Sequence, residues 1–452
     1  MEHVFLQSSL KRPLPGQGWP RRASRLPALL QCLPLLLGIV LIPVTHATPP
    51  ATSPAVASAN TPRFSAERLQ RLDGFLRKAT DAHGYLGAVS LVVHDGDVVH
   101  SQAYGYRDLD RSVPMQADSI FRIYSMTKTV TTIAVLMLVE EGKLSLDDPV
   151  EKLLPEFAGM QVFAGGTADA PELRPARSSP TVRQLLTHTA GFATAGGEEA
   201  TKLLERADLH GSADHAEFSR RLAKLPLAAE PGTRFRYDGT QMEVAARIVE
   251  VASGQDFDAF VQQRILDPLR MHDTGFSVPA SKRDRIVDIT VMGADGRLVL
   301  DAGRSAVHPG EMLNPYPGGA GGLYSTAPDF MRLCQMLLNG GALEGVSILD
   351  RKTVEQIMVN QLTFLDPPVT QFSDAEGFGL GGSVLLDPAG KGRLGPAGQF
   401  GWSGAASTYF SIDRKEHLVS ILLLQHLPND APNDLPRLST RFYNYIQEAL
   451  LP

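Results

Sequence analysis

The stretch FRIYSMTKTVTTIAVLMLVEE, residues 121–141, decides the fold of this chain. From Ser125 onward it predicts a helix that is apolar on nearly all sides and stops at Gly142, so we expect a buried central helix. Residues three apart on a helix share a face, which brings the Lys128 ammonium within reach of the Ser125 hydroxyl. A serine becomes nucleophilic when a base takes its proton, and a desolvated lysine can be that base. Ser125 and Lys128 are therefore the first candidate catalytic residues.

Strand patterns occur near both ends of the chain, and helical patterns lie between and beside them. The runs with strand character are 87–93, 98–104, 377–386, 405–412 and 418–424. The other segments with clear helical periodicity are 65–83, 325–338 and 435–450. Together they predict an α+β fold in which one antiparallel sheet is formed by both chain ends, flanked by helices, and interrupted by an inserted, mostly helical domain. We expect the α/β part at about 64–145 and 306–450 and the helical part at about 146–305.

The first 47 residues predict a signal peptide. Five cations precede a charge-free apolar stretch at 26–42, and a small-residue cleavage site follows at Ala47. Residues 48–63 are rich in Pro, Ala, Ser and Thr and predict a linker. We therefore expect an exported protein, periplasmic or secreted, with a retained N-terminal membrane anchor as the alternative.

Composition excludes several classes of function. The net charge of −6 leaves no basic excess for a phosphate backbone, so we expect no nucleic-acid partner. Two cysteines exclude a disulfide scaffold, and the twelve histidines show no metal-ligand spacing, so we expect neither a metal nor a cofactor. The glycine-rich stretch at 318–322 is better explained as a loop near the cleft than as a phosphate-binding loop. The expected partner is a small ester or amide substrate, with no obligatory protein partner.

Two further motifs follow the first in order along the chain. They are QLLTHTAGF at 184–192 and PGTRFRY at 231–237. With residues 121–128 they resemble the serine β-lactamase and penicillin-binding-protein superfamily, most closely class C β-lactamases and family VIII carboxylesterases. The resemblance covers about 64–450. It implies an α/β domain and an all-helical domain with the active site between them.

Carried over position by position, the resemblance assigns roles to single residues. Ser125 matches the acylated nucleophile and Lys128 its base partner. Tyr237 matches the tyrosine of the second motif, Y-x-N, which relays protons to and from the leaving group. His188 lies in a motif typical of the family, where it is structural.

The second and third motifs both depart from the β-lactamase pattern. Gly239 replaces the asparagine of Y-x-N, and we expect Asp238 to cap the helix that follows. The third motif, Lys-Thr-Gly in β-lactamases, reads Trp402-Ser403-Gly404 and is expected at the edge of a strand that begins near Ala405. The lysine is thus replaced by an indole, as in the tryptophan-glycine version of family VIII esterases. By the same match, the N–H groups of Ser125 and Ala405 form the oxyanion site.

The sequence therefore predicts an exported serine hydrolase that forms an acyl-enzyme. A carboxylesterase acting on short-chain or uncharged esters fits best. A β-lactamase or a D-amino-acid peptidase or amidase is the alternative with the same site. A non-catalytic cell-wall ligand-binding protein is the alternative from another class.

Overall fold

The computed structural model describes residues 63–192, 198–429, 431 and 433–451. The predicted signal peptide, and the predicted linker except for Arg63, lie outside these residues. Among the helices of the described part, none is long and apolar enough to cross a membrane.

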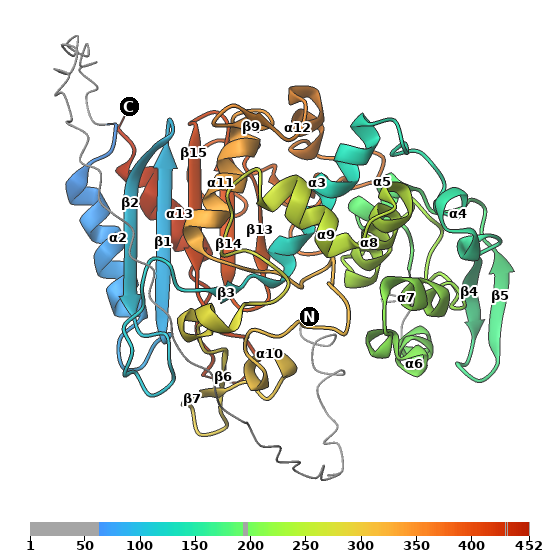
Figure 1. The fold of residues 1–452 in the computed structure, drawn as a ribbon, viewed down its shortest axis with the longest axis horizontal. Helices are drawn as coiled ribbons and strands as arrows, with labels where there is room; N and C mark the ends of the chain where they lie inside the picture. Colours follow the sequence, from blue (N-terminus) through green and yellow to red (C-terminus); the bar gives the residue numbers. More distant parts are fainter. Residues whose placement is uncertain (1–62, 193–197, 430, 432, 452) are drawn as a thin grey trace, which may run out of the picture.

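A seven-stranded antiparallel sheet is the core of the α/β part (Figure 1). Its strands come from both chain ends, and the N-terminal β1 pairs with the C-terminal β15 so that Val89 lies opposite Leu423. In sheet order the strands are β11 (Glu376–Phe378), β12 (Ser383–Leu385), β13 (Phe400–Gly404), β14 (Thr408–Asp413), β15 (Leu418–Leu423), β1 (Gly87–His94) and β2 (Asp97–Gly105). The predicted fold class, an antiparallel sheet built from both termini, is confirmed.

Helices cover both faces of this sheet. On one face α2 (Ala66–Ala79) and α13 (Ser439–Ala449) pack against side chains that include Val92 and Leu422. Their neighbours along the strands, such as Val93 and Leu423, point to the other face and join the large core that contains α3 (Thr127–Glu140) and α11 (Ala327–Leu338). The two central strands β1 and β15 are buried along their whole length, because they are covered on both sides.

The helical part is arranged around α8 (Gly239–Ser253), which packs against α3, α5, α7 and α9. Its other helices are α4 (Val150–Leu153), α5 (Val182–Leu186), α6 (Glu198–Ala207), α7 (His215–Leu222) and α9 (Phe257–Val261), with short turns η2 (Pro155–Phe157), η4 (Leu209–Gly211), η5 (Gln262–Leu266) and η6 (Ala280–Arg285). The remaining small elements are β3 (Phe121–Arg122), β4 (Gln161–Gly166), β5 (Pro171–Pro175), β6 (Thr290–Met292), β7 (Leu298–Leu300), α10 (Arg304–Val307), β8 (Tyr324–Ser325), β9 (Ala342–Leu343), β10 (Val346–Ser347) and α12 (Arg351–Ile357).

Several predicted elements differ from the observed ones, including the first helix, which ends at Ala79 and not at residue 83. The single strand expected at 377–386 is the hairpin of β11 and β12, because the backbone turns back at Gly381, whose φ of +73° suits glycine. The helix expected from Ser125 starts as the 3₁₀ turn η1 (Tyr124–Met126) and becomes α-helical at Thr127. The strand expected at 405–412 begins at Thr408, and the last helix begins at Ser439.

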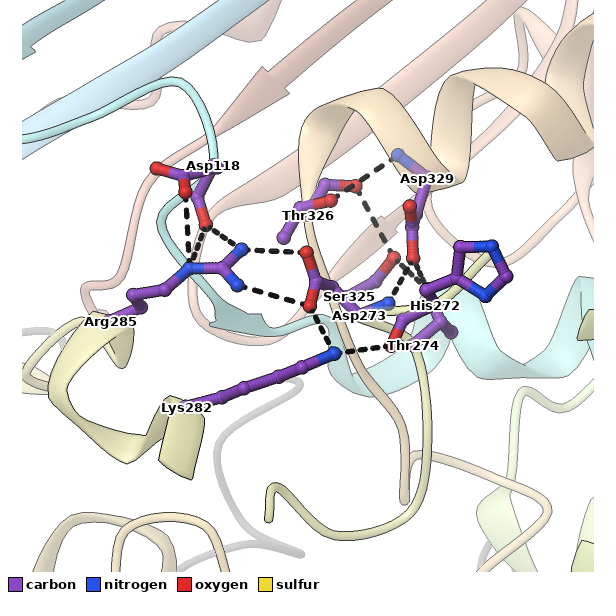
Figure 2. A network of polar contacts seen from close by, with 9 residues as sticks. All are labelled: Asp118, His272, Asp273, Thr274, Lys282, Arg285, Ser325, Thr326 and Asp329. Carbon is purple, nitrogen blue, oxygen red and sulfur yellow. Dashed lines mark hydrogen bonds and ion pairs between the residues drawn. The ribbon is translucent and has the colours of Figure 1, made fainter. Parts of the chain in front are cut away.

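A polar network ties the segment before β3 to the helical part and to α11 (Figure 2). Arg285 donates to both carboxylate oxygens of Asp273, at 3.1 and 2.7 Å, and to the carbonyl oxygen of Asp118 at 2.6 Å. The Arg285 guanidinium holds the pKa of Asp273 below its ordinary value. The Asp273 N–H donates in turn to Asp329 at the start of α11, at 2.7 Å. The segment that leads into β3 is therefore held at Asp118 by Arg285, which Asp273 links in turn to α11.

Candidate active site

Ser125 lies in η1, directly before α3, at a point where the chain reaches the surface of the core. It is half-buried, whereas Tyr124 and Met126 on either side are buried. Tyr124 has a φ of 42°, in the left-handed region that bulky residues seldom occupy. Backbone strain of this kind collects at functional sites, where the surrounding structure holds it in place.

Lys128 lies one turn further along, at the start of α3, and its residue is only 2% exposed. Its Nζ is 3.1 Å from Ser125 Oγ and donates a hydrogen bond to Ala320 O at 2.7 Å. The same ammonium lies 4.9 Å from the centroid of the Tyr237 ring. The structure thus brings the predicted nucleophile and base together at hydrogen-bond distance, inside the protein.

Tyr237 approaches the same point from the segment that precedes α8. As predicted, Asp238 caps this helix, and its carboxylate accepts from the Thr240 N–H at 2.7 Å. The Tyr237 hydroxyl oxygen accepts a hydrogen bond from Trp402 Nε1 at 3.0 Å. The second and third motifs are therefore joined by a direct side-chain contact, and the indole N–H is already engaged.

The third motif lies inside β13, not at the edge of a strand starting near Ala405 as the sequence suggested. Trp402, Ser403 and Gly404 are the last three residues of β13, and Ala405 begins the turn to β14. A Cβ at Gly404 would lie 2.3 Å from Ile123 O, so only glycine lets this strand pass so close to the segment before the nucleophile. The end of β13 and Ser125 are therefore neighbours, as the resemblance requires.

His188 packs beneath Tyr237 and is fully buried. Its ring centroid is 4.6 Å from that of Tyr237, and its Nδ1 accepts from the Asp238 N–H at 3.4 Å. Burial, and then the positive charge of Lys128, hold the pKa of His188 well below its ordinary value. The neutral His188 ring packs against the Tyr237 ring, which agrees with the structural role expected for His188.

Three cations near the third motif in sequence do not replace its missing lysine. Lys391 is paired with Glu376 at 2.6 Å. The Arg393 guanidinium lies 3.8 Å from the ring centroid of Tyr443 on α13. Lys415 follows β14 at the end opposite to the Gly404 side, since Gly404 pairs with Thr408 at the start of that strand. The third motif therefore presents an indole and no ammonium.

A comparison with models of known protein families covers most of this chain. A family model described as Beta-lactamase matches residues 72–441. The chain belongs to the β-lactamase family. This confirms the resemblance that the three motifs carry.

Relatives within the β-lactamase family include an esterase and an acyltransferase. Esterase EstB of Burkholderia gladioli is 30% identical over 375 residues, which cover 78% of this chain and 89% of that protein. Monacolin J acid methylbutanoyltransferase of Aspergillus terreus is 28% identical over 402 residues, 82% of this chain and 95% of that protein. The solved structure of simvastatin synthase from Aspergillus terreus has a TM-score of 0.69 at 25% identity, covering 84% of this chain and 98% of that one. This β-lactamase-family chain is accordingly an enzyme of the serine-hydrolase class.

One contact of the candidate base in this β-lactamase-family site is not predicted from the sequence. The Ala320 carbonyl, which holds Lys128, belongs to the glycine-rich loop that the sequence places only near the cleft. The glycines were the available signal, because runs of glycine mark a close approach of backbone to another group. No group of three or more His, Cys, Asp or Glu residues in the described part of the chain could hold a metal ion.

Proposed function

We propose that this enzyme is a carboxylesterase that hydrolyses short-chain or uncharged esters through an acyl-enzyme on Ser125. The observation that carries the proposal is the 3.1 Å approach of the buried Lys128 Nζ to Ser125 Oγ. A buried amine at hydrogen-bond distance from a half-exposed hydroxyl is the arrangement that activates a serine. It also argues against a protein that only binds ligands, which would not need this pair.

In the proposed reaction, Lys128 acts in its neutral amine form: Ser125 Oγ attacks the ester carbonyl carbon while its proton passes to the lone pair of Lys128 Nζ, which becomes an ammonium. The oxyanion of the tetrahedral intermediate accepts hydrogen bonds from the N–H groups of Ser125 and Ala405. The bond to the alcohol oxygen then breaks, and the alcohol leaves with a proton delivered from Lys128 through Tyr237. Water attacks the acyl-enzyme with the same groups in reverse, which releases the carboxylic acid and restores Ser125.

The preference for esters over lactams is supported by the third motif. A β-lactam or a D-Ala-D-Ala peptide carries a carboxylate, which the lysine of Lys-Thr-Gly binds in β-lactamases. Here the corresponding Trp402 has one donor, and that donor is bonded to Tyr237. An uncharged ester needs no such anchor, and its alcohol leaves more easily than an amine.

A substrate panel tests this proposal. Purified enzyme and Ser125→Ala are assayed with p-nitrophenyl acetate and butyrate, a chromogenic cephalosporin and a D-Ala-D-Ala peptide. We expect Ser125-dependent hydrolysis of the two esters above that of the other substrates. Preference for the cephalosporin or the peptide would favour the alternative activities. No turnover, together with no labelling of Ser125 by a fluorophosphonate, would favour the binding protein.

Acyl transfer to an alcohol is a second candidate, favoured by the aromatic surroundings of the site. The ring of Phe372, which is 37% exposed, lies 5.7 Å from that of Tyr237 and 6.2 Å from that of Trp402. Such a wall suits an apolar alcohol that competes with water for the acyl-enzyme, and one relative is named as a methylbutanoyltransferase. Adding an apolar alcohol to the p-nitrophenyl butyrate assay should then yield the transferred ester, measurable by mass spectrometry.

Export is part of the same proposal. Cleavage after Ala47 would leave the linker at 48–63 and the catalytic domain at 64–450, with its helical part inserted at about 146–305. N-terminal sequencing of the protein from the periplasm or the medium should give Thr48 as the first residue. An uncleaved protein in the membrane fraction would indicate the retained anchor instead.

A further inference from the structure

The glycine-rich loop at 318–322 is fixed along the first turns of α3. Its carbonyls accept hydrogen bonds from the helix and from the strand before it: Gly319 O from Thr131 Oγ1 (2.7 Å), Ala320 O from Lys128 Nζ (2.7 Å) and Gly322 O from Arg122 (3.2 Å). The loop therefore provides the carbonyl group that holds the Lys128 ammonium in place. Whatever holds the loop also sets the position of this ammonium.

On its other side the loop is held by Glu243 of α8. This carboxylate is buried, with its residue 3% exposed, and accepts from the N–H groups of Gly319 at 2.8 Å and Ala320 at 3.2 Å. A Cβ at Gly319 would lie 2.7 Å from Met242 O, so glycine is needed for the loop to come this close to α8. Hydrogen bonds from two successive N–H groups to a charged carboxylate are among the stronger ones in proteins.

The charge of Glu243 is balanced by His215 of α7. His215 Nε2 lies 3.4 Å from Glu243 Oε2. Its Nδ1 lies 2.8 Å from Oε1 of Glu250, which is about two turns further along α8. Burial alone would lower the pKa of His215, but the two carboxylates outweigh it and raise this pKa to about 9. The imidazole is therefore charged at neutral pH and places a cation beside the buried Glu243 side chain.

We propose that Glu243 is a positioning residue for the catalytic base Lys128. The inference rests on the proposed function, in which Lys128 takes the Ser125 proton. Glu243 fixes the N–H groups of Gly319 and Ala320, and the Ala320 carbonyl then holds Nζ opposite Ser125 Oγ. It touches no reacting atom, and it acts only through the loop. A shift of about 1 Å in a group that must be aligned can cost about a hundredfold in rate, so the loop contact has a measurable consequence.

Glu250 provides the matched control. It lies on the same helix and pairs with the same His215, but the described structure gives it no contact with the loop. We expect Glu243→Ala to lower kcat for p-nitrophenyl butyrate by about 10- to 100-fold, to alter the pH profile of kcat and to leave KM within about twofold. Glu243→Gln keeps one acceptor oxygen and the shape of the side chain, so its kcat should lie between wild type and Glu243→Ala. Glu250→Gln should lose stability but keep kcat within about twofold of wild type.

Amide hydrogen exchange of the peptide that covers the loop provides a readout independent of turnover. Exchange should rise in both Glu243 variants and stay unchanged in Glu250→Gln, all measured well below their melting temperatures. Wild-type kcat and pH profile in Glu243→Ala, or equal losses of kcat in the Glu243 and Glu250 variants, would overturn the proposal. If the wild-type enzyme shows neither ester turnover nor an acyl adduct on Ser125, the proposed function is wrong. If amide exchange of the loop is unchanged in Glu243→Ala, Glu243 does not hold the loop and the positioning proposal is wrong.

Discussion

Helices α3 and α8 pack against each other and both serve the candidate site, but they do so in different ways. The start of α3 has no side-chain cap, is buried on nearly every side and carries the groups proposed to react, Ser125 just before it and Lys128 within it. The start of α8 is capped by Asp238, and its interior carries the buried carboxylate of Glu243. Helix α3 and the turn before it carry the side chains proposed to react. Helix α8 holds the loop at 318–322, which in turn holds Lys128.

Removal of the proposed nucleophile, which lies on the α3 side, is expected to have the largest effect. Ser125→Ala should lower ester turnover by about 10⁴-fold or more, as losses of a catalytic nucleophile do. Its melting temperature should stay close to that of wild type, because the Ser125 side chain caps no helix. Initial rates with p-nitrophenyl butyrate, together with thermal unfolding curves, measure both. Substantial turnover by the folded variant would mean that another residue is acylated.

Tyr237 lies where the two helices meet, and its loss is expected to have the next largest effect. Tyr237→Phe removes a proton carrier but keeps the ring, so kcat should fall by about 10²- to 10⁴-fold. Phe372→Leu is the matched control, because it removes a ring neighbour of Tyr237 and leaves the hydroxyl in place. Near-normal kcat in Tyr237→Phe would show that the match to the second motif is wrong.

The sequence predicts the α3 side of the site well and the α8 side poorly, for a physical reason. Ser125 and Lys128 can be recognised as a nucleophile and its base because of their residue types and because residues three apart on a helix share a face. Glu243 interrupts a helical apolar pattern in the way that a solvent-facing residue does. Its burial is decided by His215 and by the loop at Gly319, both distant in sequence.

The sheet is predictable from the runs with strand character near both chain ends, whereas the limits of its strands are less so. From the sequence, the third motif is expected at the edge of a strand that begins near Ala405. In the structure Gly404 belongs to β13, and its missing side chain makes room for Ile123 O, a contact between residues far apart in the chain. Close approaches of this kind have no local signature.

The preference for one substrate class over another tests the role of the third motif. A charge-assisted hydrogen bond is worth about 1.5–3 kcal/mol, so the absence of a lysine at Trp402 should cost a carboxylate-bearing substrate about tenfold to more than a hundredfold. We expect kcat/KM for p-nitrophenyl butyrate to exceed that for a chromogenic cephalosporin by at least about a hundredfold. Parallel assays of wild type and Trp402→Lys measure this. Equal efficiency of wild type on both substrates would favour the lactamase alternative, and Trp402→Lys should then add little.

A smaller effect is expected when only the indole donor is removed. Trp402→Phe keeps an aromatic ring but loses the hydrogen bond to the Tyr237 hydroxyl. A neutral hydrogen bond contributes about 1 kcal/mol, so kcat should fall by about fivefold. An unchanged kcat would show that Tyr237 is held by its other neighbours, such as His188.

The α8 side also predicts a dependence of stability on pH. The pKa of His215 is raised to about 9 in the folded protein and is about 6.5 when unfolded, so its contribution is complete below pH 6.5 and is lost as the pH rises through about 9. The melting temperature of wild type should therefore fall more steeply between pH 7 and pH 10 than that of His215→Gln. Parallel curves for the two proteins would show that His215 is not charged between Glu243 and Glu250.

Trapping the acyl-enzyme shows which residue carries the acyl group during turnover. Wild type is quenched during turnover of a slowly hydrolysed p-nitrophenyl ester, and the adduct is located by peptide mass spectrometry. We expect one acyl group on the peptide that contains Ser125 and none on the Ser125→Ala variant. An adduct on any other residue, or ester turnover by wild type without an adduct on Ser125 under conditions that preserve acyl-serine, would contradict this expectation.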